Sequence, residues 1–288
     1  MKCVTYNIQY CTGLDGKVDP QRIIDEVTGA DVIALQEVER FWERSDNIDQ
    51  VEIFREHFSD YFCVYGAGVD LHVESSSPVD NMRRQFGNMI LSKYPILHSR
   101  IHLLPKRGSI GPISIQRCAV EATISVNDNL LRIYSIHLTH LSSETRMPQI
   151  EWIQDIHRSA IHEGYPVQGD LNGKDWGHNI TDEMQVVANY ALMFGDFNFQ
   201  PDSEEYNAIV GPVSAYVDHI TPQDGFVDAW THCGGDKMAS VTCYVHGKPA
   251  RLDYCFTSTA IRNKLISCQV NETAKGSDHL PVWVELDL

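Results

Sequence analysis

The chain has 288 residues, of which 43% are hydrophobic and 22% are charged, and its formal net charge is −16. This size and composition are typical of one large folded domain, and no apolar run is long enough to cross a membrane. Proteins that grip a nucleic-acid backbone usually present a basic surface, so the acidic balance argues against a nonspecific nuclease.

The eight cysteines indicate neither a zinc ribbon nor a redox site. None of them forms a Cys-x-x-Cys pair, and Cys118 and Cys255 lie in apolar runs, where a thiol packs as a small hydrophobic group. The first residues lead directly into a strand-like segment and lack the features of a signal peptide. We therefore expect reduced cysteines in a cytoplasmic protein.

One stretch of the chain is basic although the rest is acidic. Seven basic residues and no acidic residue lie from Arg83 to Arg117. Two interpretations stay open: these residues balance charge locally, or they attract an anionic substrate.

The hydrophobic pattern predicts alternating strands and helices. Strands are expected at residues 2–10, 31–38, 86–92, 97–104, 117–126, 130–138, 190–194, 251–257 and 281–286, with a hairpin turn at 127–129. Helices are expected from Asp19-Pro20 to Gly29, at 48–58, at 146–162 and from 201–203 to 210. Residues 163–189 are polar and are expected to form an irregular insertion. Because no linker divides the chain, we predict one layered α/β domain over residues 1–288.

Polar side chains recur where the predicted strands end, and their types point to a metal-dependent reaction. They are Asn7, Glu37, His137, Asp196, Asn198, Asp253, Asp278 and His279. Carboxylate and amide oxygens suit Mg²⁺ or Mn²⁺, and histidines suit proton transfer and contacts to phosphate oxygens. No serine nucleophile elbow is present. Attack by water on a phosphoester, assisted by a bound metal ion, is the simplest chemistry that uses these groups.

Seven segments, in order, resemble the signature of the endonuclease/exonuclease/phosphatase superfamily. They are TYNI (5–8), LQEV (35–38), GNMILSKYPI (87–96), SIHLTHL (135–141), GDFN (195–198), RLDYCF (251–256) and SDHLPV (277–282). Members of that superfamily include deoxyribonucleases, apurinic endonucleases, neutral sphingomyelinases and inositol polyphosphate 5-phosphatases. The resemblance implies a four-layer sandwich of two packed mixed β-sheets flanked by helices, with the active site at one end.

The resemblance also implies a metal site and a site for the attacking water. Glu37 would be the principal metal ligand, with Asn7 beside it and Asp278 assisting. Asp196 would position or deprotonate the water.

The remaining residues would act on the phosphate group. His279, oriented by Asp253, would contact the phosphate or act as acid or base. Asn198 would hold a phosphate oxygen, and His137 would make a contact that strengthens as negative charge builds up on the non-bridging oxygens. Arg117 is a further candidate for contact with the substrate.

Two departures from the family pattern bear on the substrate. Position 9 is Gln, where apurinic endonucleases carry a carboxylate, and His137 fits the sphingomyelinase and phosphatase branches better. With the acidic net charge, these features favour a phosphodiesterase or phosphatase that acts on a lipid head group or small phosphate ester. The alternatives are a metal-dependent nuclease, which the basic stretch favours, and a binding module without activity.

The motif Gly-Asp-x-Asn occurs twice, at 169–172 and at 195–198. The second copy follows an apolar strand and precedes a capped helix, whereas the first lies in the polar insertion. We therefore predict Asp196 rather than Asp170 as the catalytic residue, and we expect His140, Arg146 and Gln149 to support the site. Neither the substrate nor the oligomeric state can be read from the sequence, because specificity would lie in variable loops, here 41–50, 66–85, 104–116, 163–189 and 232–249.

Overall fold

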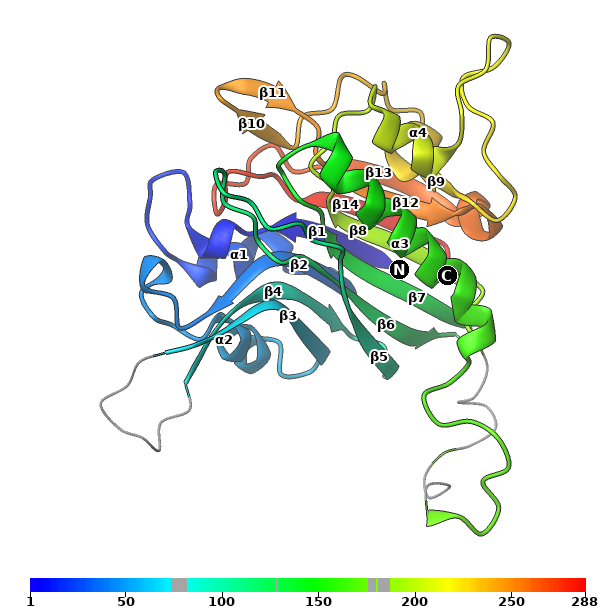
Figure 1. Cartoon of the computed structure of the whole chain (residues 1–288), viewed down its shortest axis with the longest axis horizontal. Coiled ribbons are helices and arrows are strands. Elements are labelled where there is room, and N and C mark those ends of the chain that lie inside the picture. Colours follow the sequence, from blue (N-terminus) through cyan, green and yellow to red (C-terminus); the bar gives the residue numbers. More distant parts are fainter. Residues whose placement is uncertain (74–81, 128, 176–179, 181–186) are drawn as a thin grey trace.

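A computed structural model describes residues 1–73, 82–127, 129–175, 180 and 187–288. In this part of the chain, two six-stranded mixed sheets pack face to face, and helices cover both outer faces (Figure 1). The predicted four-layer sandwich is confirmed.

The first sheet contains one parallel pair of strands. Its order is β13 (Leu265–Val270), β14 (Val282–Leu286), β1 (Lys2–Asn7), β2 (Val32–Arg40), β4 (Arg83–Ser92) and β3 (Phe62–His72). Strands β1 and β2 are parallel, and the other neighbours are antiparallel. The nearly continuous apolar run of β2 is explained by burial on both faces, because Ala34 faces the second sheet while Leu35 packs under the helices.

The second sheet repeats this arrangement. Its order is β5 (Ile96–Leu103), β6 (Cys118–Val126), β7 (Asn129–His137), β8 (Tyr190–Asp196), β12 (Asp253–Ser258) and β9 (Phe226–Asp228). Only β7 and β8 are parallel. A separate hairpin consists of β10 (Cys243–Val245) and β11 (Lys248–Ala250).

Helices connect the parallel pairs and close the outer layers. On the first sheet lie α1 (Pro20–Val27) and α2 (Gln50–His57), and on the second lie α3 (Ser143–Glu163) and α4 (Glu204–Val210). The short helix α5 (Ala229–His232) follows β9, and the 3-10 turns are η1 (Gln9–Cys11), η2 (Glu43–Ser45) and η5 (Thr259–Lys264). Helix α1 begins as predicted, with Asp19 accepting a hydrogen bond from the Gln21 N–H and Pro20 in the first turn. No helix in the described ranges is long and apolar enough to span a membrane.

Two predicted loops contain strands. Residues 66–72 belong to β3 and pair with β4, so the predicted loop 66–85 was wrong over this part. Gly68 lies where a Cβ would come within 2.5 Å of the Gln116 carbonyl oxygen, so the strand needs a residue without a side chain there. The predicted loop 232–249 likewise contains β10 and the start of β11. Residues 74–81, 128, 176–179 and 181–186, which fall in the predicted loops, turn and insertion, lie outside the described residues.

A buried polar network joins the two sheets near the ends of β1, β2 and β7. The Gln36 amide donates to Ser135 Oγ at 3.0 Å, and Thr5 Oγ1 donates to Gln36 Oε1 at 3.3 Å. From β4, Asn88 Nδ2 donates to the carbonyl oxygens of Cys118 and Ser135 at 2.9 and 3.0 Å. Because a buried polar group without a partner is destabilising, these hydrogen bonds favour one position of the first sheet relative to the second.

We expect Asn88→Ala to lower the free energy of unfolding by about 2 kcal/mol or more, because it removes two buried hydrogen bonds and leaves a void. Urea unfolding followed by circular dichroism measures this change. The control is Asn263→Ala, at an exposed position, which should change stability by less than about 0.5 kcal/mol. Equal stability of the two variants would show that the network contributes nothing.

Candidate active site

The polar residues predicted from the sequence meet at one end of the sandwich because the strands that carry them end side by side. Asn7 pairs in register with Gln36, the residue before Glu37, and His137 pairs with Asp196. Asp253, at the start of the antiparallel strand β12, pairs with Asp196 from the other side. The termini lie together at the opposite end of β1 (Figure 1), where the Met1 amino group donates to the Leu286 carbonyl oxygen at 2.7 Å.

These side chains surround a polar hollow of about 300 Å³, which we call the catalytic pocket. The predicted residues that line it are Glu37, Arg117, His137, Asp196, Asn198, Asp278 and His279. Asn7 and Asp253 are not part of the lining. Both are almost fully buried and touch the pocket residues from behind.

A β-bulge turns Glu37 toward the pocket. The register of β2 on β4 shifts between Leu35 and Val38, and both of these residues pack on the helix-covered side of the sheet. The extra residue, Glu37, has a φ of 60°, in the left-handed region that non-glycine residues rarely adopt. Strained backbone of this kind is common at functional sites, where the surrounding structure holds it in place.

The Glu37 carboxylate has weak partners. Asn7 Nδ2 lies 3.4 Å from Oε1 and His137 Nε2 lies 3.8 Å from it. In the described part of the chain, no lysine or arginine forms an ion pair with this carboxylate. Asp278 lies on the same pocket, where Gln9 Nε2 donates to Oδ2 at 2.9 Å. Oxygen donors without cationic partners fit a hard divalent cation.

Asp196 is the most densely hydrogen-bonded carboxylate of the pocket. Asn7 Nδ2 donates to Oδ2 at 3.0 Å and the Asn198 N–H donates to Oδ1 at 2.9 Å, while His137 Nε2 lies 3.3 Å from Oδ2. Burial raises the pKa of Asp196 well above its usual range, although the charge of His279 opposes the shift. A carboxylate with a raised pKa is suited to accept a proton near neutral pH.

His279 forms an ion pair with Asp253. Its Nδ1 lies 2.8 Å from Asp253 Oδ2, and its Nε2 lies 3.8 Å from Asp196 Oδ2. Burial by itself would lower the pKa of His279, but the carboxylates of Asp253 and Asp196 outweigh it and raise the pKa above the usual range. His279 is therefore protonated at neutral pH and can donate a proton.

A second group of possible metal ligands among the site residues consists of Asp196, Asp253 and His279. Ligand atoms of Asp196, Asp253 and His279 all fall within 4.8 Å of one another. Since Nδ1 of the protonated imidazole already pairs with Asp253, these three residues form an ion-pair cluster. The oxygens of Glu37 and Asp278 are better suited to hold a cation.

Arg117 determines which nitrogen of His137 carries a proton. Its Nη1 donates to His137 Nδ1 at 2.9 Å, and an arginine can only donate. The proton of the neutral ring therefore resides on Nε2, which faces Asp196 and the pocket. Burial, reinforced by the nearby guanidinium, holds the pKa of His137 far below its usual range.

Asn198 differs from its predicted role in one respect. Both donors of its amide group are in use, one on the Leu138 carbonyl oxygen at 3.0 Å and one on Asp196 Oδ2 at 3.2 Å. In this arrangement Asn198 orients Asp196. Contact with a phosphate oxygen requires it to exchange the bond to Asp196 for one to the substrate.

Arg44, Tyr10, Phe86 and Ile115 also line the pocket and were not predicted. Arg44 Nε donates at 3.0 Å to the buried carboxylate of Glu39, and the guanidinium lies 4.4 Å from the centre of the Tyr10 ring. The one signal in the sequence was Glu39 itself, a charged residue in a buried strand that needs a partner.

Part of the basic stretch balances charge locally. Of its seven basic residues, only Arg117 lines the catalytic pocket. Arg83 pairs with Asp70 at 2.8 Å, and Lys93 pairs with Asp31 at 3.1 Å.

The repeated motif and the supporting residues have distinct positions. Asp170 is exposed and does not line the pocket. His140 lines it, 3.5 Å from Arg117 Nη2. Gln149 accepts a hydrogen bond from the Thr139 N–H at 2.9 Å and so holds the loop that follows His137. Arg146 pairs with Glu205 at 2.9 Å.

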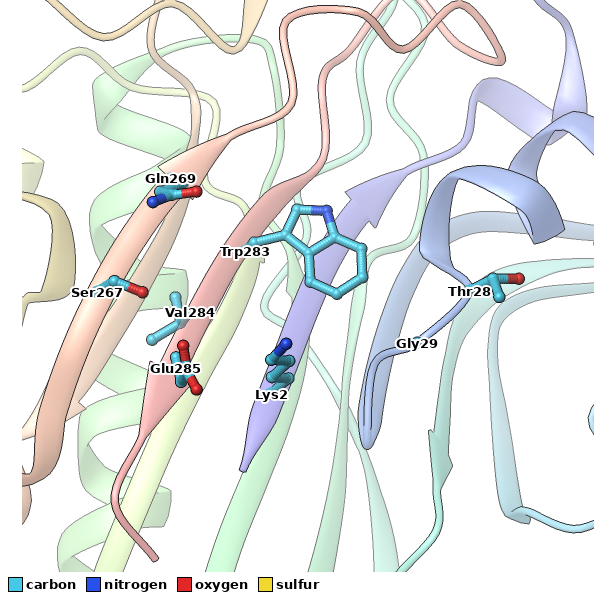
Figure 2. A pocket seen from close by; sticks show the side chains of 8 residues that line it. All are labelled: Lys2, Thr28, Gly29, Ser267, Gln269, Trp283, Val284 and Glu285. Carbon is cyan, nitrogen blue, oxygen red and sulfur yellow. The ribbon is translucent and has the colours of Figure 1, made fainter.

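A separate hollow of about 370 Å³ lies on the helix-bearing face of the first sheet (Figure 2). Trp283 and Glu285 of β14 and Lys2 of β1 extend over it, and no residue of it is shared with the catalytic pocket. It holds no histidine and no cluster of carboxylates, so it lacks the chemistry of an active site.

Comparison with known proteins identifies the family. A family model described as the Endonuclease/Exonuclease/phosphatase family matches residues 4–279. The chain belongs to this family, as its ordered motifs suggested. No curated protein matches the sequence.

Solved structures share the fold along nearly their whole length. An endonuclease/exonuclease/phosphatase family protein from Leptotrichia buccalis C-1013-b is 20% identical with a TM-score of 0.63, and the match covers 100% of both chains. The mannosyl-6-phosphatase Bt3783 of Bacteroides thetaiotaomicron VPI-5482 is 16% identical with a TM-score of 0.62, again over 100% of both chains. Truncated TDP2 of Caenorhabditis elegans is 18% identical with a TM-score of 0.62, over 99% of this chain and 96% of that one. At these identities the likeness shows the fold alone.

Proposed function

We propose that the protein is a divalent-metal-dependent hydrolase that cleaves phosphoester bonds by direct attack of water. Family membership supports a phosphoester hydrolase. The observation that carries the proposal is the placement of Asp196, with its raised pKa, between a protonated His279 and the Glu37 carboxylate, which has no lysine or arginine partner among the described residues.

The oxygens of Glu37, Asn7 and Asp278 would hold the cation, with Mg²⁺ or Mn²⁺ as the fitting ions. When bound, a divalent cation supplies Lewis-acid stabilisation of negative charge on the phosphate oxygens.

Asp196 and His279 carry out the two proton transfers of the reaction. Asp196 accepts a proton from the attacking water, whose oxygen bonds to phosphorus as the ester P–O bond breaks. The protonated His279, held by Asp253, gives a proton to the departing oxygen. His137 Nε2–H, fixed by Arg117, donates to a non-bridging oxygen where charge develops.

Three features favour a small phosphate ester or a lipid head group as the substrate over a nucleic acid. The catalytic pocket is small, about 300 Å³, one residue of the basic stretch reaches it, and the chain carries a net charge of −16. A polynucleotide would need a basic track along its backbone. Efficient cleavage of plasmid DNA with a steep salt dependence would favour the nuclease instead.

We expect Asp196→Ala and His279→Ala each to lower turnover of bis-p-nitrophenyl phosphate by roughly 10²-fold or more, because each removes a proton-transfer group. Release of p-nitrophenolate in Mg²⁺ or Mn²⁺ measures it. The matched control is Asp170→Ala, in the repeated motif, which should leave turnover unchanged. Wild-type turnover in either active-site variant would refute the role of that residue.

We expect Glu37→Gln to weaken Mn²⁺ binding by at least about 10-fold, since a neutral amide replaces the carboxylate that faces the pocket without an ion-pair partner. Electron paramagnetic resonance of free Mn²⁺ measures the affinity independently of activity. Glu43→Gln, at an exposed position six residues later, is the control and should bind Mn²⁺ like the wild type. Unchanged affinity in Glu37→Gln would place the metal site elsewhere.

A further inference from the structure

A second hollow opens directly beside the catalytic pocket. It measures about 540 Å³ and shares Arg44, Phe86 and Ile115 with the catalytic pocket, so the two hollows are adjacent. We call it the side groove. Its size lies within the range of about 300–1,000 Å³ that is usual for small-molecule sites.

The side groove is apolar where the catalytic pocket is polar. Its walls come from separate elements and include Trp42, Val69, Leu71, Phe86, Ile113 and Ile115. Leu71 is 50% exposed and Ile113 is 75% exposed, on two different walls. Large apolar side chains that line a hollow and remain in contact with water are typical of a ligand site.

Two contacts hold walls of the side groove in place. Trp42 Nε1 donates to the Gln85 carbonyl oxygen at 2.8 Å, which holds the indole ring. Close contact between Gly68 and the backbone at Gln116 brings the loop that carries Ile113 and Ile115 against β3. A groove held in this way can bind an apolar group without first being ordered.

Arg44 marks the boundary between the two hollows. Its guanidinium is bound to the buried Glu39 and lies 5.2 Å from the Trp42 ring centre and 5.9 Å from that of Phe86. The other charged residue of the side groove, Asp70, pairs with Arg83. Both charges of the groove are therefore compensated, which removes the electrostatic attraction that a second phosphate would need.

We propose that the side groove binds an apolar substituent, an aryl group or an alkyl chain of several carbons, on a small soluble phosphoester whose phosphate occupies the catalytic pocket. The inference rests on the proposed function and names the class of its substrate. The substituent exchanges water for Trp42, Leu71 and Ile113, and the gain grows with the apolar area buried. The net charge of −16 disfavours approach to an anionic lipid surface.

The test is a series of diesters, methyl, butyl and hexyl p-nitrophenyl phosphate, assayed below their aggregation limits by release of p-nitrophenolate. A buried methylene raises kcat/KM by roughly three- to fourfold. We expect the hexyl ester to exceed the methyl ester by at least about 30-fold, with most of the gain in KM.

Two variants assign the effect to the groove. Ile113→Ser should reduce the ratio of kcat/KM for the hexyl and methyl esters by at least about fivefold. Ile110→Ser makes the same change on the same loop, at a fully exposed position outside the groove lining, and should leave the ratio unchanged. Leu71→Ser, on another wall, repeats the test with a separate element.

The outcomes separate the two proposals. Equal kcat/KM across the series, in an enzyme that hydrolyses the methyl ester, overturns the side-groove proposal and leaves the phosphoesterase. Hydrolysis of none of these diesters overturns the side-groove proposal, and if p-nitrophenyl phosphate is not hydrolysed either, the proposed function is contradicted as well. A kcat/KM for thymidine 5′-(p-nitrophenyl phosphate) above that for the hexyl ester also overturns the side-groove proposal, because it shows that the groove selects a nucleoside.

Discussion

The site depends on how two separate sheets are held against each other. The groups suited to a cation, Asn7 and Glu37, lie at the end of β1 and at the bulge of β2 in the first sheet, whereas His137 and Asp196 end strands of the second sheet. His279 lies in the segment that leads into β14. Gln36 and Asn88 both donate hydrogen bonds to Ser135 across the two sheets. Gln36 directly precedes Glu37, and Ser135 lies two residues before His137. A shift of one sheet on the other would separate the two halves of the site, so these bonds link packing directly to chemistry.

The carboxylates of the site differ in whether a positive charge lies beside them. Asp253 is neutralised by its ion pair with His279, while Glu37 faces the pocket without a cationic partner. Asp196 lies between them, and its burial favours the protonated form. Gathering negative groups in this way is destabilising, and a bound cation would relieve the unfavourable energy. The strained backbone at Glu37 fits the same interpretation.

Much of the site could be predicted because its polar residues lie in or next to apolar strands, close to one end of the sandwich. Parallel strands end at the same edge, so Asn7 with Glu37, and His137 with Asp196, had to be neighbours. Arg44 could not be predicted, since a 3-10 turn brings it back over the pocket. The hydrogen bonds of Asn198 and the walls of the side groove depend on contacts between distant segments. Strand β3 was not predicted, and its glycines, which close packing requires, interrupt the apolar pattern by which a strand is recognised.

The central claim is that one residue from each sheet acts on the same phosphorus atom. A double-mutant cycle of Glu37→Gln and Asp196→Asn, followed by turnover of bis-p-nitrophenyl phosphate in Mg²⁺, tests it most directly. Residues that act as a unit lose activity together. We therefore expect the double variant to be no slower than the slower single variant, to within roughly threefold. Losses that multiply in the double variant would contradict a shared reaction centre.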